Sequence, residues 1–211
     1  IFPLYPSMLD YYLAREGTTG MLGSIVASLD HLRLWLGARP DQGHDIIFGW
    51  FLSALYALLQ FICAPLLGSL SDRIGRRPIL LFAIAGIALS YGMWFFASTF
   101  AMLVAARLMG GLMSGNISAA SAVIADITSD KDRSRGMAIL GFGIGVAFMF
   151  GPVIGAVASL VDFTKIWPAA AAYGVNPYSA AAGASLLLAV TNWIVVAIGL
   201  PETLPQRGAS S

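Results

Sequence analysis

Long apolar runs alternate with short polar connections along most of this chain. Five runs are long enough to cross a bilayer as helices, at residues 46–70, 78–97, 99–125, 136–161 and 178–200. As a helix rising about 1.5 Å per residue, the first run reaches roughly 37 Å, which exceeds a hydrocarbon core of about 30 Å. The pattern predicts an all-α, polytopic membrane bundle.

The segment before these runs has a different pattern. Residues 1–9 are apolar but too short to span, and we interpret them as the end of a first helix, so that residues 1–211 form one six-helix domain. Residues 10–45 form a polar, extracytoplasmic connection in which apolar side chains recur at helical spacing. That helix could lie flat at the membrane interface or cover the outer mouth of the bundle. Its apolar face comprises Met21, Leu22, Ile25, Val26, Leu29, Leu32 and Trp35 or Leu36.

Composition narrows the class of protein. Hydrophobic residues make up 58% of the chain and charged residues only 11%, against about 25% charged residues in soluble domains. The single cysteine, Cys63, excludes an internal disulfide, and no metal-ligand cluster or nucleophile with a matching base stands out. We therefore expect an integral membrane protein without a cofactor, a metal or an enzymatic activity.

Positive charges gather on one side of the predicted spans. Residues 71–77 and 126–135 hold six of the twelve lysines and arginines, whereas the opposite short connections hold only Lys165, and the arginines of residues 10–45 are balanced by acidic residues there. The positive-inside rule then predicts that these two loops face the cytoplasm, or the matrix or stroma of an organelle. Which membrane holds the protein stays open.

The connection between the first two spans carries a dense motif. The stretch from Gly68 to Leu80, GSLSDRIGRRPIL, resembles the signature G-x-L-a-D-r-x-G-r-r-x-x-l between the second and third helices of the major facilitator superfamily. The resemblance implies a gating site that latches the cytoplasmic side in one state of the transport cycle. Its residues would be Gly68, Asp72, Arg73, Gly75, Arg76 and Arg77.

Elementary chemistry gives these positions separate tasks. Gly68 would let a helix of the other transporter half approach closely, and Gly75 permits a tight turn. Asp72 can face the positive N-terminal end of such a helix and can pair with Arg76. The alternative, in which arginines only fix topology, explains Arg73 and Arg77 but not an aspartate and two glycines at fixed offsets.

Arg107 is a formally charged residue well inside a predicted span. A cation there is costly unless it meets a partner or a water-filled cavity, so it is a functional candidate. The surrounding stretch resembles the family's fourth-helix motif, l-x-x-x-R-x-x-q-G, with Gly110 where glutamine is usual. The resemblance implies a role in proton coupling, and a purely structural role is the alternative.

The fourth apolar run, which follows the family pattern of a fifth helix, carries a small-residue motif. It resembles g-x-x-x-G-P-x-x-G-G, which distinguishes antiporters of the superfamily from symporters, with alanine for glycine at both ends. The alternative is close helix packing without a meaning for transport. The motif residues are Ala147, Gly151, Pro152, Gly155 and Ala156.

Polar residues inside the spans are candidates for contacts with a substrate. Substrate sites in such folds lie near the midplane, between two bundles. Each candidate could instead form a hydrogen bond between helices of this bundle. The candidates are Tyr56, Gln60, Asn116, Ser118 and Asn192.

Taken together, the motifs resemble the N-terminal six-helix half of a major facilitator, with closest likeness to the tetracycline-transporter-like drug:proton antiporters. This implies proton-coupled antiport of amphiphilic drugs or organic anions by alternating access. The expected partners are the lipid bilayer, protons and a small-molecule substrate. A C-terminal six-helix half, from the same polypeptide or a second copy, or other membrane subunits should cover the bundle. Nucleic acid is not an expected partner.

One component of that mechanism is not visible in the spans. A proton-coupled antiporter needs an embedded carboxylate, and Asp72, Asp126 and Glu202 all fall at predicted helix ends. The carrier would lie in the start of the first helix or in the second half, or would not exist. The alternative function is therefore a transporter-derived structural subunit of a larger membrane complex, without transport activity.

Overall fold

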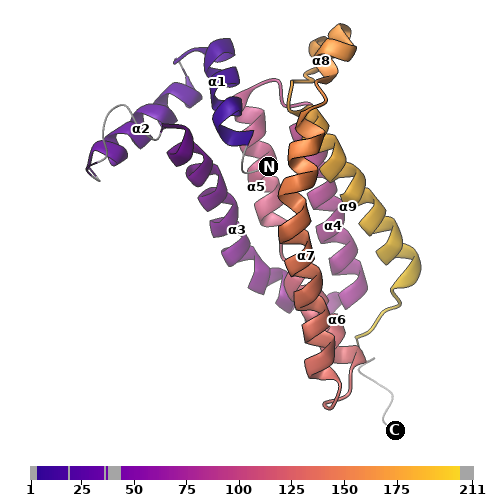
Figure 1. Cartoon of the computed structure of the whole chain (residues 1–211). Coiled ribbons are helices and arrows are strands. Elements are labelled where there is room, and N and C mark those ends of the chain that lie inside the picture. The colour runs from indigo at the N-terminus through magenta and orange to yellow at the C-terminus, as the bar shows by residue number, and fades with distance from the viewer. Residues whose placement is uncertain (1–3, 19, 36, 38–43, 205–211) are drawn as a thin grey trace.

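The computed structural model describes residues 4–18, 20–35, 37 and 44–204, which form helices and connections without any strand. Figure 1 shows the order of the helices along the bundle. Their bounds are α1 Tyr5–Glu16, α2 Met21–Trp35, α3 His44–Ile74, α4 Arg76–Phe95, α5 Phe100–Leu112, α6 Asn116–Ile127, α7 Arg133–Ser159, α8 Phe163–Ile166, the 3₁₀ helix η2 Pro168–Tyr173, and α9 Ser179–Gly199.

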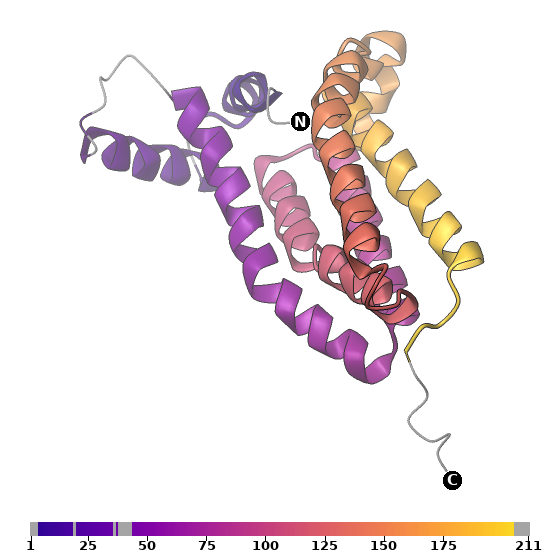
Figure 2. The same ribbon diagram turned by 60° about the horizontal axis from the view of Figure 1, so that its bottom comes forward.

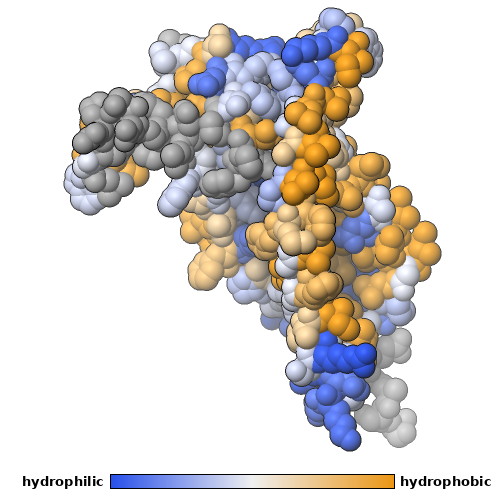
Figure 3. All heavy atoms as spheres, viewed as in Figure 1, coloured by the Kyte–Doolittle hydropathy of each residue, from blue (hydrophilic) through white to orange (hydrophobic). Residues whose placement is uncertain are grey.

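Five helical segments of the described part are long and apolar enough to cross a membrane. They are Phe48–Ile74, Arg76–Phe95, Phe100–Ile127, Arg133–Ile166 and Ser179–Gly199. Figure 3 shows hydrophobic residues around the middle of α7 and α9 and hydrophilic residues towards both ends of the molecule. The predicted fold class, an all-α membrane bundle with five spans, is confirmed.

The bundle has two ends that differ in chemistry. The charged end comprises the α3–α4 junction, the end of α6 and the residues after α9, and the opposite end comprises α1, the α4–α5 turn and the start of α9. The largest core cluster lies at the opposite end, where α1 packs on α3. Its fully buried side chains include Met8, Leu9, Tyr12, Leu22, Phe48, Leu52, Trp94 and Phe100.

Two connections hold more helix than expected. α1 continues from the predicted end at residue 9 to Glu16, because Met8, Leu9 and Tyr12 form a continuous buried stripe at helical spacing. At the charged end, α3 continues to Ile74 and α4 starts at Arg76, so the predicted loop 71–77 consists of two helix ends. Gly75 alone separates them, with a φ of 131° that favours glycine.

The predicted span 99–125 is built from two helices rather than one. α5 ends at Leu112 and α6 starts at Asn116, with a turn between them in which the Ser114 hydroxyl donates to the Gly111 carbonyl at 2.7 Å. Close packing explains Gly115 in this turn, because a Cβ there would lie 2.7 Å from the Leu67 side chain of α3. Close packing against α3 therefore accompanies the break in the helix at this turn.

The helix predicted from apolar spacing in the first connection is present as α2. Leu22, near its start, is fully buried, whereas Trp35 at its far end is 81% exposed. Figures 1 and 2 show that α2 projects sideways from the bundle rather than over it. This placement favours the interfacial alternative over a cover for the outer mouth.

Candidate functional site

Arg76 is the centre of the charged end. Its side chain is 11% exposed, and its Nε donates to Asp126 Oδ2 at 2.8 Å, across to the end of α6. Its Nη1 donates to Ser71 Oγ at 2.9 Å and to Asp72 Oδ1, both in the last turns of α3. One guanidinium therefore connects the ends of three helices, and the planar, five-donor geometry of arginine suits that task.

Glu202 adds a fourth chain segment to this cluster. Its carboxylate accepts the backbone N–H groups of Arg76 at 2.9 Å and of Arg77 at 3.3 Å, which are the first donors of α4. Burial by itself would raise the pKa of Glu202, but hydrogen bonds from the backbone N–H groups of Leu204, Arg76, Arg77 and Thr203 outweigh it and hold the pKa below its ordinary value. A carboxylate is well placed at this helix N-terminus.

The other predicted gating residues take different positions. Asp72 has a side chain that is 58% exposed despite its ion pair. Arg73 is exposed, and Arg77 Nη2 donates to the Ala197 carbonyl of α9 at 2.7 Å. Gly68 was expected to admit a helix of another bundle, but it faces α6 of this chain, where its Cβ would lie 3.4 Å from Ser118 Oγ.

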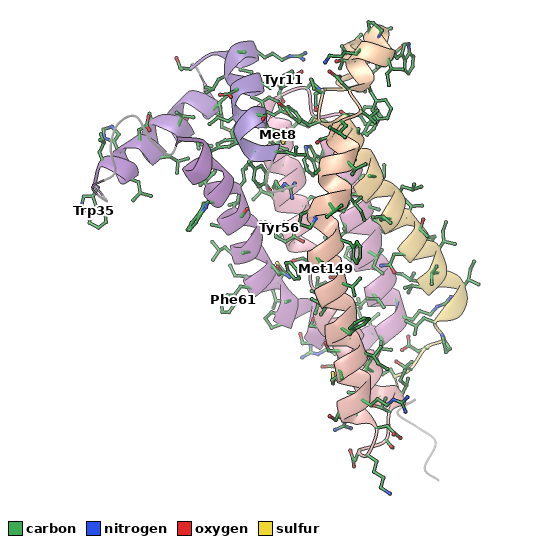
Figure 4. The ribbon with its side chains drawn as sticks, in the orientation of Figure 1. Met8, Tyr11, Trp35, Tyr56, Phe61 and Met149 are labelled. Atoms are coloured by element: carbon green, nitrogen blue, oxygen red, sulfur yellow. The ribbon has the colours of Figure 1, made fainter. Side chains whose placement is uncertain are left out.

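Arg107 lies between aromatic rings in the interior of the bundle. Its guanidinium carbon is 4.3 Å from the centroid of Trp94 and 5.7 Å from that of Tyr5. Both distances fit cation–π contacts. Figure 4 shows Tyr56 directed from α3 into the bundle, and this side chain lines one small pocket together with Arg107.

The substrate candidates fall into three environments. Asn116 and Asn192 line one groove of about 340 Å³ between α4, α6 and α9, whereas Tyr56 lines the Arg107 pocket. Gln60, one turn after Tyr56 on α3, is half-buried. Ser118 donates to the Ala64 carbonyl of α3 at 3.0 Å, which makes it a contact between helices.

The small-residue motif lies on an open side of α7. Ala147, Gly151, Pro152 and Ala156 are exposed, and a Cβ on Gly151 would meet no atom within 4 Å. Gly155 alone of the motif is buried. Together with side chains of α4 and α9, the motif residues except Ala156 line a groove of about 360 Å³ rather than a packed contact.

Neutral hydrogen bonds join several elements at the opposite end, where the Glu16 carboxylate also accepts the backbone N–H of Phe100 at 2.7 Å. The Ala97 carbonyl accepts from Tyr12 at 2.8 Å and from Asn176 Nδ2 at 3.0 Å, and Ser179 Oγ donates to the Phe95 carbonyl at 2.6 Å. These bonds join α1 and the start of α9 to the α4–α5 turn. Burial raises the pKa of the Tyr12 hydroxyl above its ordinary value.

Several partners were not among the predicted site residues. Asp126 and Glu202 belong to stretches, Ala125–Gly141 and 200–205, that resemble the family's linker and sixth-helix end, which was the available signal. Ser71 lies within the stretch from Gly68 to Leu80 but was not assigned a role there, and Trp94 lies in none of the motifs. No group of three or more metal-ligating side chains occurs among the described residues.

Comparison with known proteins gives concordant results. The family model of the Major Facilitator Superfamily matches residues 4–211. Two relatives are called major facilitator superfamily domain-containing protein 10. The protein of Mus musculus is 32% identical over 100% of this chain and 42% of its own length. The protein of Homo sapiens is 33% identical over 97% of this chain and 41% of its own length. The class C tetracycline resistance protein of Escherichia coli is 40% identical over 72% of this chain and 40% of its own.

A solved structure agrees with these relatives. The crystal structure of the human organic anion transporter MFSD10 (TETRAN) matches with a TM-score of 0.81 and 32% identity, over 96% of this chain and 43% of that one. This chain therefore spans about two fifths of the length of the relatives it matches.

Proposed function

Because the chain belongs to the Major Facilitator Superfamily, we propose that it is the N-terminal half of a secondary active transporter, not of an enzyme. In this proposal the complete protein moves small organic molecules by alternating access and exchanges them for protons. The names of its relatives support organic anions or tetracycline-like amphiphiles as the substrate class.

The geometry of the charged end is the observation that carries the proposal. Arg76 and Glu202 tie together α3, α4, α6 and the segment after α9, so this end of the bundle moves as one body. Asp72 belongs to the same cluster but keeps a 58% exposed side chain. A latch needs both properties, since it must be rigid on its own half and must retain one charge for the other half.

The second half supplies the partner of Asp72 in this proposal. The positive N-terminal end of one of its helices would face the Asp72 carboxylate when the cytoplasmic side is closed. The charged end then faces the cytoplasm, or the equivalent side of an organelle membrane, as the positive-inside rule predicts. Opening requires this contact to break while the Arg76 cluster stays intact.

The open surface of α7 supports the same arrangement. Ala147, Gly151 and Gly155 share one face of α7 and line a groove of about 360 Å³ that α9 also borders, and their lack of side-chain bulk suits close approach of a helix from the second bundle. The resemblance of this stretch to the antiporter motif favours exchange over symport. Arg107 is the residue that we expect to couple exchange to protons.

Transport by the complete protein in proteoliposomes tests this proposal. A pH gradient should drive accumulation of an anionic amphiphile such as 2-naphthoate or of a tetracycline, and collapse of the gradient should abolish it. Vesicles without protein provide the background. Absence of gradient-driven flux for both probes, together with co-purification of unrelated subunits, would instead identify a structural subunit.

A further inference from the structure

Arg107 lacks a counter-charge within the described part of the chain. Its Nη2 is buried and has no hydrogen-bond partner there, and the same holds for Trp94 Nε1, whose ring lies over the guanidinium. Two aromatic rings stabilise the cation but accept no conventional hydrogen bond from Nη2. A cation inside a membrane span normally has an acidic partner or an aqueous cavity.

The polar side chains that line the pocket at Arg107 carry hydroxyl or N–H groups. Tyr56, Ser90 and Tyr91 contribute hydroxyl groups, beside the N–H groups of Arg107 and Trp94, and no lining side chain is a carboxylate or an amide. The Ser90 hydroxyl already donates to the Ile87 carbonyl, so the buried donors without a partner in this lining are Arg107 Nη2 and Trp94 Nε1. Such a lining favours a group that brings negative charge and lone pairs.

The size of the pocket limits what enters it. Its volume is about 10 Å³, which is close to the space for a single water-sized atom. One oxygen of a planar carboxylate meets that limit, whereas a whole organic molecule does not. Ile87 and Tyr91 are also walls of the groove of about 340 Å³ that holds Asn116 and Asn192, so the pocket borders a larger space.

Gly110 keeps this pocket open. It lines the pocket, and a Cβ at this position would lie 3.1 Å from Ser90 Oγ and 3.2 Å from Tyr56 Cε2. The related motif has glutamine here, and its longer side chain would occupy the same space. Glycine in place of the motif's glutamine at position 110 therefore leaves the pocket beside Arg107 open.

We propose that Arg107, with Trp94 and Tyr56, forms an anion notch that takes one oxygen of a carboxylate. The carboxylate belongs either to a transported organic anion or to a part of the complete transporter outside these residues. The first source rests on the function proposed above and assigns Arg107 to substrate recognition. In the second, the group in the notch is itself the missing embedded carboxylate.

Equilibrium binding to the complete purified protein tests the notch. The probes are radiolabelled 2-naphthoate and its neutral counterpart 2-naphthamide at pH 7.5, with the parent and the variants Arg107→Gln, Arg107→Lys and Gly110→Ala. The exposed Arg135→Gln variant, outside the gating motif, is the matched control, and gel filtration confirms folding. For a substrate carboxylate, the parent should bind naphthoate at least tenfold more tightly than the amide, Arg107→Gln and Gly110→Ala should lose this preference, and Arg107→Lys should keep part of it.

The infrared spectrum of the same proteins without ligand distinguishes a carboxylate of the transporter from a carboxylate of the substrate. If the transporter supplies the carboxylate, Arg107→Gln and Gly110→Ala should shift a protein carboxylate band that Arg135→Gln leaves unchanged, and the parent should show no naphthoate preference. Two outcomes would overturn the notch, and in both of them the carboxylate bands are unchanged in the variants. In the first, the parent binds naphthoate and naphthamide equally. In the second, the preference for naphthoate survives in Arg107→Gln. If the protein shows a naphthoate preference that depends on Arg107 but no proton-driven flux in proteoliposomes, only the proposed transport function is refuted.

Discussion

The two ends of the bundle solve the same structural problem with different chemistry. At the opposite end, Tyr12, Asn176 and Ser179 donate to main-chain carbonyls, and these bonds lie within the chain. At the charged end, Arg76 binds two carboxylates, one of which belongs to the exposed Asp72. Bonds to main-chain groups within the chain, most of them neutral, hold one end together, with the Glu16 carboxylate on the Phe100 N–H as a charged member. The charged end instead keeps the capacity to bind a further group.

This difference predicts different responses to substitution. Loss of a bond at the opposite end should reduce stability and leave the transport cycle otherwise unchanged. At the charged end, Arg76 should matter for stability and Asp72 for transport, because only the former is buried.

Arg76→Ala should have the largest effect on stability. The substitution removes ion pairs to two helices and leaves the Asp126 carboxylate, whose side chain is 20% exposed, without its cation. We expect a loss of about 3 kcal/mol in the free energy of unfolding, at the low end of the range for breaking a buried pair. Unfolding in mixed micelles measures it, and Arg73→Ala, which changes an exposed side chain, should stay within about 0.5 kcal/mol of the parent.

Asn176→Ala should be the most costly change at the opposite end. Asn176 is fully buried, donates to the Ala97 carbonyl and accepts the backbone N–H of Tyr178 at 2.9 Å. Its loss leaves that N–H without its acceptor, so we expect a decrease of about 2 kcal/mol in the same unfolding measurement. Asn192→Ala, on an exposed position, is the matched control. A loss below that of the control would mean that these neutral bonds do not hold this end together.

Tyr12→Phe should cost less than Asn176→Ala. The substitution removes one hydrogen bond, but the Ala97 carbonyl keeps its bond from Asn176 and the ring keeps its packing against Phe100. We expect a loss of about 1 kcal/mol on unfolding. If Tyr12→Phe loses as much unfolding free energy as Asn176→Ala or more, the two hydrogen bonds shared by the Ala97 carbonyl do not account for the stability of the region.

Glu202 gives the charged end a weak dependence on pH. Because the pKa of Glu202 is lowered in the folded protein, its contribution is complete above the ordinary glutamate pKa of about 4.3 and is lost as the pH falls through the lower folded value. The difference in melting temperature between the parent and Glu202→Gln should therefore be constant from pH 7 to about 4.5 and should shrink at lower pH. A difference that already vanishes at pH 6 would contradict the assigned hydrogen bonds.

The sequence predicted local features better than contacts across the bundle. Five apolar runs and the turn at Gly75 follow from hydropathy and from the conformational freedom of glycine, so the fold class could be predicted. The pairing of Arg76 with Asp126 joins residues that are 50 positions apart, and that of Tyr12 with Ala97 joins residues 85 positions apart. Nothing in the local pattern specifies such pairs, because they depend on how helices pack.

Packing also explains features of the structure that the sequence pattern did not specify. Gly68 was assigned to an external contact, but its spacing is equally suited to the contact with Ser118 that the structure contains. The break between α5 and α6 has the same origin, since Gly115 admits Leu67 of α3. A glycine in the sequence indicates close approach without identifying the approaching element.

Proton-driven flux through the Asp72→Asn variant tests the central claim, that the charged end is a latch with one charge reserved for a second bundle. The complete protein in proteoliposomes is compared with Asp72→Asn and with Asp130→Asn, which changes a carboxylate that is 94% exposed and paired only with Arg133. The latch predicts that Asp72→Asn retains the melting temperature of the parent but loses flux about tenfold, as for an interaction worth about 1.4 kcal/mol in the transition state, while Asp130→Asn transports normally. Equal flux in the parent and in Asp72→Asn would contradict the latch.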